Sequence, residues 1–172
     1  DLKAMIEADA ELRGMVNIIE STKRIVHYAS GSFYQALSSD AKSKHGFNPS
    51  CVIYDELAQA RDRNLYDVLT TAMGARGQPL TWVISTKSAN RHSVMSELVE
   101  YGRQVCDGIV PDPAFRAFIF EVPLDADPFD ESLWKLANPA LGDFRSLEEM
   151  RQAAAKAQRI PARLPAFRNL YL

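Results

Sequence analysis

Two adjacent carboxylates, Asp55 and Glu56, follow directly on the apolar run 51–54. At the end of a strand, one carboxylate of such a pair can hold a hydrated Mg²⁺ that bridges nucleotide phosphates, while the next polarises the attacking water. This arrangement suits nucleotide hydrolysis. The same residues are equally compatible with two acids that only favour the start of a following helix through its positive dipole end.

A second polar cluster, residues 85–90, follows the apolar run 80–84. A helix of about 15 residues fits between the two apolar runs as a right-handed crossover, which would bring both polar clusters to one edge of a sheet. Ligands bind at the carboxyl ends of strands in open α/β sheets. A hydroxyl-rich strand end there can sense a γ-phosphate and transmit its presence by a loop shift. The alternative is an ordinary polar loop that caps the helix starting near His92.

The elements around these clusters alternate between strand and helix patterns. Runs 51–54 and 80–84 are continuously apolar, as expected of strands buried on both faces of a parallel sheet, and residues 115–122 predict a third strand. Helical spacing of apolar residues spans 59–73 and resumes after Asn90. This order of elements predicts an α/β fold.

Further elements are expected on either side of this core. Residues 2–16 have helical spacing that is interrupted around Gly14, residues 24–28 and 32–37 predict a hairpin, and residues 38–50 predict a loop. Strand-like alternation places five aromatic side chains in the core: Tyr28, Phe33, Tyr54, Trp82 and Phe118.

Near the C-terminus, Ser146 and Glu149 have the spacing of a capping box. They predict a helix that begins after Ser146 and runs to about Ile160.

Composition excludes several classes of protein. The formal net charge is −2, from 20 basic and 22 acidic side chains, which gives no reason to expect non-specific nucleic-acid binding by the whole chain. A local excess of six basic over three acidic residues in 143–168 could contact DNA phosphates or form a solvated helix face. No apolar stretch approaches the roughly 20 residues that span a bilayer, which excludes an integral membrane protein. The cysteines and histidines lack metal-ligand spacing, which argues against structural zinc and favours a reduced intracellular setting.

No phosphate-binding loop of the form G-x-x-x-x-G-K-[ST] occurs in the 172 residues. The sequence opens at Asp1 without a signal-peptide pattern and enters helical periodicity at once. Such a start is typical of a segment from the middle of a longer protein. The chain alone is expected to be inactive, because no backbone nest or lysine would hold the β- and γ-phosphates.

Several segments resemble, in chain order, the large terminase subunit of tailed bacteriophages. They are residues 37–49, 52–58, 66–80, 137–142 and 167–172, and the last resembles a segment found just before the nuclease domain. The resemblance runs from about residue 24 to the end of the chain. The combination of these segments is far more specific than any one of them.

Large terminase subunits are ATP-driven DNA-packaging motors with an N-terminal P-loop ATPase domain and a C-terminal RNase H-like nuclease domain. The resemblance implies a P-loop NTPase-type α/β fold, in which a mainly parallel sheet is flanked by helices and the Walker A strand and loop are absent from this chain. It also implies that residues 1–123 are the C-terminal part of the ATPase domain. Residues 124–172 would then be a helical linker subdomain leading toward a nuclease domain beyond Leu172.

The resemblance assigns roles to individual residues. Asp55 matches the Walker B aspartate that holds Mg²⁺, Glu56 matches the catalytic glutamate, and residues 85–89 match the coupling motif. This segment departs from the more usual Thr-Thr-Ala-Gly form. Its candidate phosphate-sensing hydroxyls are those of Ser85, Thr86 and Ser88.

Arg76 and Arg91 lie where an arginine could reach a nucleotide bound to a neighbouring ring subunit, and the alternative for each is a solvated loop charge. The implied cofactors are ATP and Mg²⁺. The implied partners are double-stranded DNA, the small terminase subunit, the portal protein and further copies of the subunit in a homo-oligomeric ring, with no membrane. The implied location is the cytoplasm of the bacterial host, at the viral procapsid during packaging.

Two other functions stay open at this stage. A helicase-like nucleic-acid translocase also pairs an Asp-Glu strand end with a Ser/Thr-Ala motif on the next strand, but it gives no reason for segments 137–142 and 167–172. A non-enzymatic binding or assembly module would use Asp55 and Glu56 only as a helix start.

Overall fold

The computed structural model describes residues 2–38, 46–88 and 90–172, and the chain forms two compact units, Asp1–His45 and Gly46–Leu172. Of the predicted loop 38–50, residues 39–45 lie outside the described residues, as does Ala89 of the predicted coupling segment. Among the residues described, no helix is long and apolar enough to cross a membrane.

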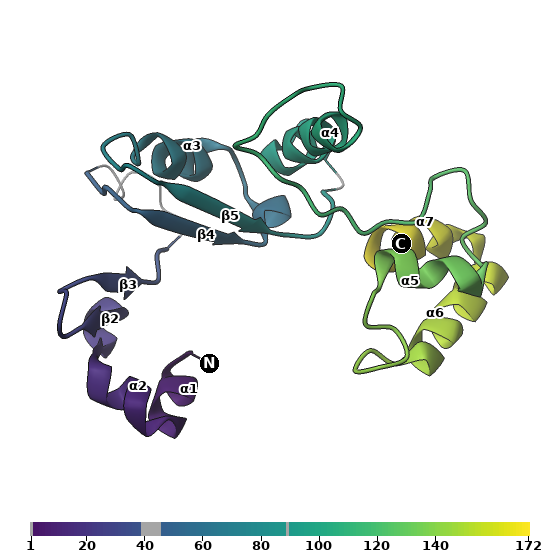
Figure 1. Ribbon diagram of the computed structural model, residues 1–172. Coiled ribbons are helices and arrows are strands. Elements are labelled where there is room, and N and C mark those ends of the chain that lie inside the picture. Colours follow the sequence, from purple (N-terminus) through teal and green to yellow (C-terminus); the bar gives the residue numbers. More distant parts are fainter. Residues whose placement is uncertain (1, 39–45, 89) are drawn as a thin grey trace. The chain divides into compact units, whose positions relative to one another are not determined.

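The first unit begins with two short helices, α1 (Leu2–Ala8) and α2 (Ala10–Met15) (Figure 1). The Asp9 carboxylate caps α2 by accepting hydrogen bonds from two backbone N–H groups of its first turn. The helical region is therefore interrupted at Asp9. The predicted interruption around Gly14 is wrong, because Gly14 lies inside α2.

Three antiparallel strands follow in the order β1 (Val16–Ile19), β2 (Arg24–His27) and β3 (Phe33–Gln35). The predicted hairpin is confirmed as β2 and β3. Across this pair the Arg24 Nε donates to the Gln35 Oε1 at 2.9 Å. The sequence pattern does not predict β1, because its first residue, Val16, continues the helical spacing of residues 2–16.

The second unit contains a parallel pair of strands, β4 (Cys51–Asp55) and β5 (Leu80–Ile84). They are connected through η3 (Leu57–Gln59) and α3 (Asn64–Thr71), and Figure 1 shows α3 along one face of the pair. The predicted strands are confirmed. The predicted helix 59–73 begins later than expected, because the Asp62 carboxylate accepts the first N–H of α3 at 2.9 Å.

Within the described residues of the second unit, only one face of the two strands is covered. Val52 packs with Leu69 and Met73 on the side of α3. On the other face the register places Ile53 opposite Trp82, and these side chains are 58% and 52% exposed. The prediction that both strands are buried on both faces is therefore wrong for the described structure, since the parallel connection brings a helix to one side only.

Most of the aromatic residues predicted for the core are also exposed. Tyr54, on the α3 side of β4, is half-buried. The other four are exposed: Tyr28, Phe33, Trp82 and Phe118. Alternation along a strand distinguishes two faces but does not tell which one is covered, and the core assignment of these four residues is wrong.

The helix predicted after Asn90 is confirmed as α4 (Val94–Cys106). Ser93 begins it, because its side chain accepts the Ser96 N–H at 3.2 Å.

Residues 115–122 form no strand in the part of the chain that the structure describes, so the predicted third strand is wrong. They pack along α4 instead. A Cβ added to Gly102 would lie 2.8 Å from the Ala117 Cβ, which shows how closely the two backbones approach. Nearby, the Arg103 guanidinium binds both carboxylate oxygens of Glu121, with the shortest distance 2.6 Å. The alternation that predicts a strand here reflects one side of the segment packing on a helix.

The C-terminal part of the second unit is helical. Its elements are η4 (Glu131–Leu133), α5 (Trp134–Ala137), α6 (Leu147–Arg159), η5 (Pro161–Arg163) and α7 (Leu164–Tyr171).

The serine half of the capping box is confirmed, because the Ser146 Oγ accepts the Glu149 N–H at 3.2 Å where α6 begins. The return bond from the Ser146 N–H to the Glu149 carboxylate is absent among the described residues. A core of aromatic and aliphatic side chains lies between these helices, with Met150 only 1% exposed and Trp134 stacked edge-on against Phe167.

Candidate functional site at the carboxyl ends of β4 and β5

The ends of the two parallel strands bring the predicted polar clusters together. In the register of the pair Asp55 lies opposite Ile84, and the Glu56 N–H donates to the Ile84 carbonyl at 2.8 Å. Ser85 follows directly, so both clusters occupy one edge of the sheet. This juxtaposition is the one predicted from the crossover connection.

A side-chain hydrogen bond joins the two strand ends. The Ser85 Oγ accepts the Ala58 N–H at 2.9 Å and donates to the Thr86 carbonyl at 3.0 Å. Ala58 belongs to η3, the single turn that follows Glu56. The first residue of the second cluster therefore contacts the turn that carries the second carboxylate.

Glu56 has a left-handed backbone, with φ 56° and ψ 40°. A non-glycine residue rarely adopts this conformation, which costs roughly 1–2 kcal/mol. The next residue, Leu57, is only 1% exposed and anchors the turn in the core. Strained backbone of this kind is concentrated at functional sites.

The carboxylates of Asp55 and Glu56 are exposed and have no hydrogen-bond or ion-pair partner among the described residues. No group of three or more His, Cys, Asp or Glu side chains in that part of the chain is placed to hold a metal ion. Magnesium is commonly bound by one or two carboxylates together with water and substrate phosphates. One exposed aspartate at a strand end fits that mode of binding.

The remaining hydroxyls differ in their contacts. Thr86 is exposed, and its hydroxyl has no partner among the described residues. The Ser88 Oγ accepts the Asn90 N–H at 3.2 Å within the loop. Of the three candidate hydroxyls, only that of Ser85 reaches the turn after the carboxylates.

The two candidate arginines lie at different edges. Arg91 is exposed in the loop between β5 and α4, on the side of the carboxylates. The Arg76 guanidinium donates to the Asn48 carbonyl, shortly before β4 begins. A five-residue strand separates that edge from Asp55 by roughly 16 Å, at about 3.3 Å per residue.

An arginine that sequence analysis does not single out links two helices next to these strands. The Arg63 Nε lies 2.7 Å from the Asp67 Oδ2, and its Nη1 lies 3.3 Å from the Glu97 Oε1 on α4. Hydrogen bonding to Asp67, and its charge and that of Glu97, raise the pKa of Arg63 above its ordinary value. The spacing of Arg63 and Asp67 by four residues is the available signal for this pair.

Burial has the largest effect on the pKa values of two tyrosines where β4 packs against α3. It raises the pKa of Tyr54, and the Asp62 carboxylate adds to the effect. Burial likewise raises the pKa of Tyr66, whose ring centroid is 6.3 Å from that of Tyr54. Tyr54 therefore stays neutral next to Asp55.

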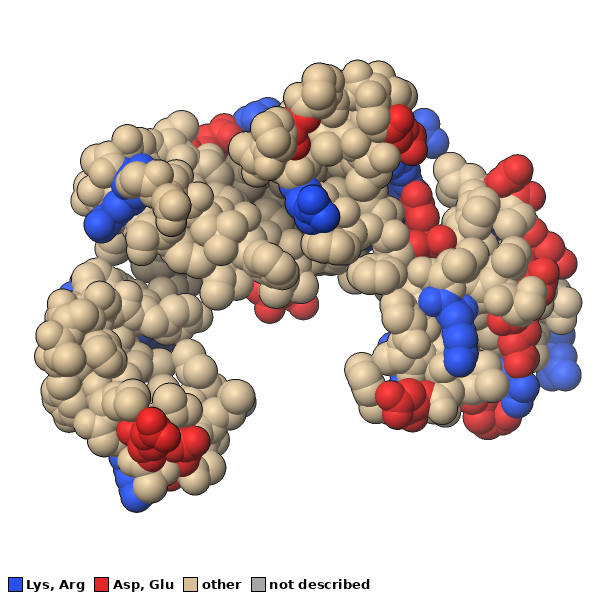
Figure 2. All heavy atoms as spheres, in the orientation of Figure 1, with Lys and Arg blue, Asp and Glu red and all other residues tan. Residues whose placement is uncertain are grey.

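Basic side chains do not gather into one patch on the face shown in Figure 2, where carboxylates lie among them. Within 143–168, Arg151 lies 2.6 Å from Glu131, Arg168 donates to two backbone carbonyls at 3.1 Å, and Arg145 lies 5.4 Å from an aromatic ring. The other three basic residues are exposed and have no ion-pair partner among the described residues: Lys156, Arg159 and Arg163.

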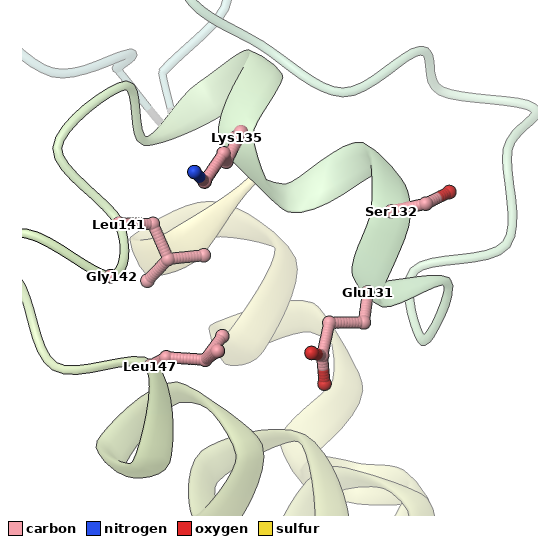
Figure 3. Close-up of a pocket in the computed structure, with 6 residues that line it drawn as sticks. All are labelled: Glu131, Ser132, Lys135, Leu141, Gly142 and Leu147. Atoms are coloured by element: carbon pink, nitrogen blue, oxygen red, sulfur yellow. The ribbon is translucent and has the colours of Figure 1, made fainter.

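A pocket of about 430 Å³ lies in the helical part and is drawn in Figure 3. Its walls come from η4, α5, the loop at Leu141 and Gly142, and the beginning of α6. None of the residues predicted to carry chemistry lines it.

Comparison with protein families identifies the chain. The model of the terminase large subunit, ATPase domain, matches residues 12–104, and the model of the terminase large subunit, endonuclease domain, matches residues 109–171. The first match alone covers more than half of the 172 residues, and the chain belongs to the terminase large subunit family. The predicted resemblance and the predicted α/β fold, with a small parallel sheet, are thereby confirmed. The helicase-like and non-enzymatic alternatives are not favoured.

Individual relatives agree with this assignment. The chain is 37% identical over 171 residues to the terminase large subunit of Enterobacteria phage HK97, which covers 98% of the chain and 33% of that protein. It is 31% identical over 97 residues to protein YmfN of Escherichia coli strain K12, covering 56% of the chain and 21% of that protein. The crystal structure of the HK97 bacteriophage large terminase matches with a TM-score of 0.85 at 35% identity, over 99% of this chain and 35% of that one. The chain thus spans about one third of the length of its phage relative.

Proposed function

We propose that the full-length protein hydrolyses ATP to translocate viral double-stranded DNA into a capsid. The observation that carries this proposal is the meeting of Asp55, Glu56 and Ser85 at one strand edge, in a chain of the terminase large subunit family. Its sheet would be of the P-loop NTPase type. The parallel order of β4, α3 and β5 supports that assignment.

Asp55 and Glu56 would divide the chemistry of hydrolysis. Bound Mg²⁺ would supply positive charge at the β- and γ-phosphates, and Asp55 is the residue that would hold it. Glu56 would orient the attacking water through its carboxylate, which is exposed and unpaired within the described residues. Its strained backbone supports this role, because a rigid turn fixes the direction of the side chain.

The residues after β5 would couple the phosphate state to movement. Ser85, Thr86 and Ser88 lie at or next to the strand edge that carries Asp55. Arg91 lies on the same side and is the better candidate for an arginine acting on a neighbouring subunit's nucleotide. Arg76 would act only from the opposite edge, on a different neighbouring surface.

Residues 1–123 would form the C-terminal part of the ATPase domain and residues 124–172 a linker subdomain. The partners would be double-stranded DNA, the small terminase subunit, the portal protein and further copies of the subunit in a ring. The site of action would be the bacterial host cytoplasm, at the procapsid. For the 172-residue chain alone we expect negligible ATPase activity, because it holds no G-x-x-x-x-G-K-[ST] loop.

Replacement of Glu56 by Gln in the full-length protein tests the proposal. The amide keeps the size of the side chain but cannot accept a proton from water, so ATP turnover should fall by at least about 100-fold while ATP binding persists. Turnover is measured by phosphate release, binding by nucleotide fluorescence, and packaging by protection of DNA from nuclease. Ser50→Ala, directly before the opposite end of the same strand, is the control. Undiminished turnover and packaging in Glu56→Gln would refute the catalytic assignment.

A further inference from the structure

The only hydrogen-bond donor of the Ser85 hydroxyl is already used within the protein. A serine hydroxyl has a single O–H donor. In Ser85 that donor is directed to the Thr86 carbonyl at 3.0 Å, while the oxygen accepts the Ala58 N–H at 2.9 Å. A phosphate oxygen near Ser85 could accept a hydrogen bond only from this O–H group, which already donates to the Thr86 carbonyl.

The hydrogen bond to Ala58 supplies an acceptor for a backbone N–H in the turn after Glu56. N–H groups in the first turn of a helix have no acceptor within that helix. The Glu56 side chain does not cap η3, so Ser85 supplies the cap from the neighbouring strand. Glu56 is then held by three contacts: its N–H on the Ile84 carbonyl, its carbonyl on the Gln59 N–H, and the Ser85 cap on Ala58.

We propose that Ser85 is a positioning residue that holds the left-handed turn at Glu56, and is not a phosphate sensor. This inference rests on the proposed function, in which Glu56 orients water. Because Ser85 continues β5, a shift of that strand end would be passed through Ala58 to the turn that aims the Glu56 carboxylate. Thr86 and Ser88, whose O–H donors have no acceptor among the described residues, are the hydroxyls left to contact phosphate.

Amide hydrogen exchange on the 172-residue chain tests the contact itself. In Ser85→Ala the Ala58 amide should exchange about tenfold faster, whereas amides in the α3 interior keep their rates. Ser85→Thr should restore slow exchange. Ser85→Val should not, because valine has the shape of threonine but no hydroxyl group. The Thr/Val pair keeps the test valid if the smaller alanine disturbs the fold. Thr86→Val is the control and should leave Ala58 unchanged. An Ala58 amide that exchanges equally in the Thr and Val variants would overturn the proposal.

Kinetics in the full-length protein separate positioning from sensing. Ser85→Ala should lower kcat for ATP about tenfold or more with KM changed less than about threefold, and Ser85→Thr should recover most of kcat. A raised KM with unchanged kcat would instead show a phosphate contact and would overturn the inference. Full kcat in Ser85→Ala beside an inactive Glu56→Gln would overturn it while leaving the proposed function intact. An active Glu56→Gln variant would refute the proposed function. The hydrogen-exchange result would then test only whether Ser85 holds the Ala58 N–H.

Discussion

At the scale of single residues, Glu56 joins an exposed carboxylate to a left-handed backbone that a glutamate adopts at a cost. The sequence pattern identifies the residue, because two acids directly follow an apolar run. It does not identify the backbone conformation, since no glycine or asparagine marks the position. The same holds for Ser85: its type is visible, but its partner lies 27 residues away and depends on the strand register.

Replacement of Glu56 by Gly should therefore stabilise the 172-residue chain. Glycine adopts positive φ without strain, and after its larger loss of chain entropy the free energy of unfolding should rise by about 0.5–1 kcal/mol. Glu56→Ala, which keeps the strain, is the matched comparison. Urea unfolding followed by circular dichroism measures both. A glycine variant less stable than the alanine variant would show that the turn is not strained.

At the scale of elements, the close packing of α4 against residues 115–122 requires a residue without a side chain at position 102, which is Gly102. The sequence predicts α4 correctly, because helical spacing is a local property. It predicts residues 115–122 wrongly as a strand. Alternation shows which side chains are buried, but it does not show whether the neighbouring backbone is a strand or a helix. Ala117 faces the helix, while Phe118 is 70% exposed. Pairing between distant segments has no local signal.

Gly102→Ala should destabilise this packing although alanine is the better helix former. Overpacking against Ala117 costs about 1–3 kcal/mol, which at least equals the gain of about 1 kcal/mol in helix propensity and over most of the range exceeds it. Gly14→Ala in α2, where a Cβ meets no atom within 4 Å, should instead be stabilising. Native-state hydrogen exchange in each helix measures the two effects. Restored protection in the double variant Gly102→Ala, Ala117→Gly would identify the clash as the cause, and unchanged protection in Gly102→Ala would contradict it.

At the scale of the whole molecule, the described residues of the second unit leave one face of the β4–β5 pair uncovered. The sequence predicts the α/β class and the family correctly, but it places Ile53, Trp82 and Ile84 in a two-sided core where the structure leaves them more than half exposed. A continuous apolar run indicates burial on both faces only when helices cover both, and that depends on chain connectivity.

The isolated 172-residue chain should accordingly self-associate through this face. Light scattering should show an average mass that rises with concentration, and Ile53→Lys should shift it toward the monomer by placing a charge at the centre of the patch. Ser50→Lys adds the same charge outside the apolar face and should have little effect. A clean monomer for the unaltered chain at all concentrations would contradict the prediction.

The helical C-terminal part begins and ends at one point. The Val122 N–H donates to the Leu172 carbonyl at 3.1 Å, and the Arg168 Nη1 donates to the Leu124 carbonyl at 3.1 Å. About fifty residues thus form a loop of chain whose two ends are joined by hydrogen bonds. Tension applied along the polypeptide would load these few bonds first, and the packed helices around Met150 would bear none of it until the ends had separated.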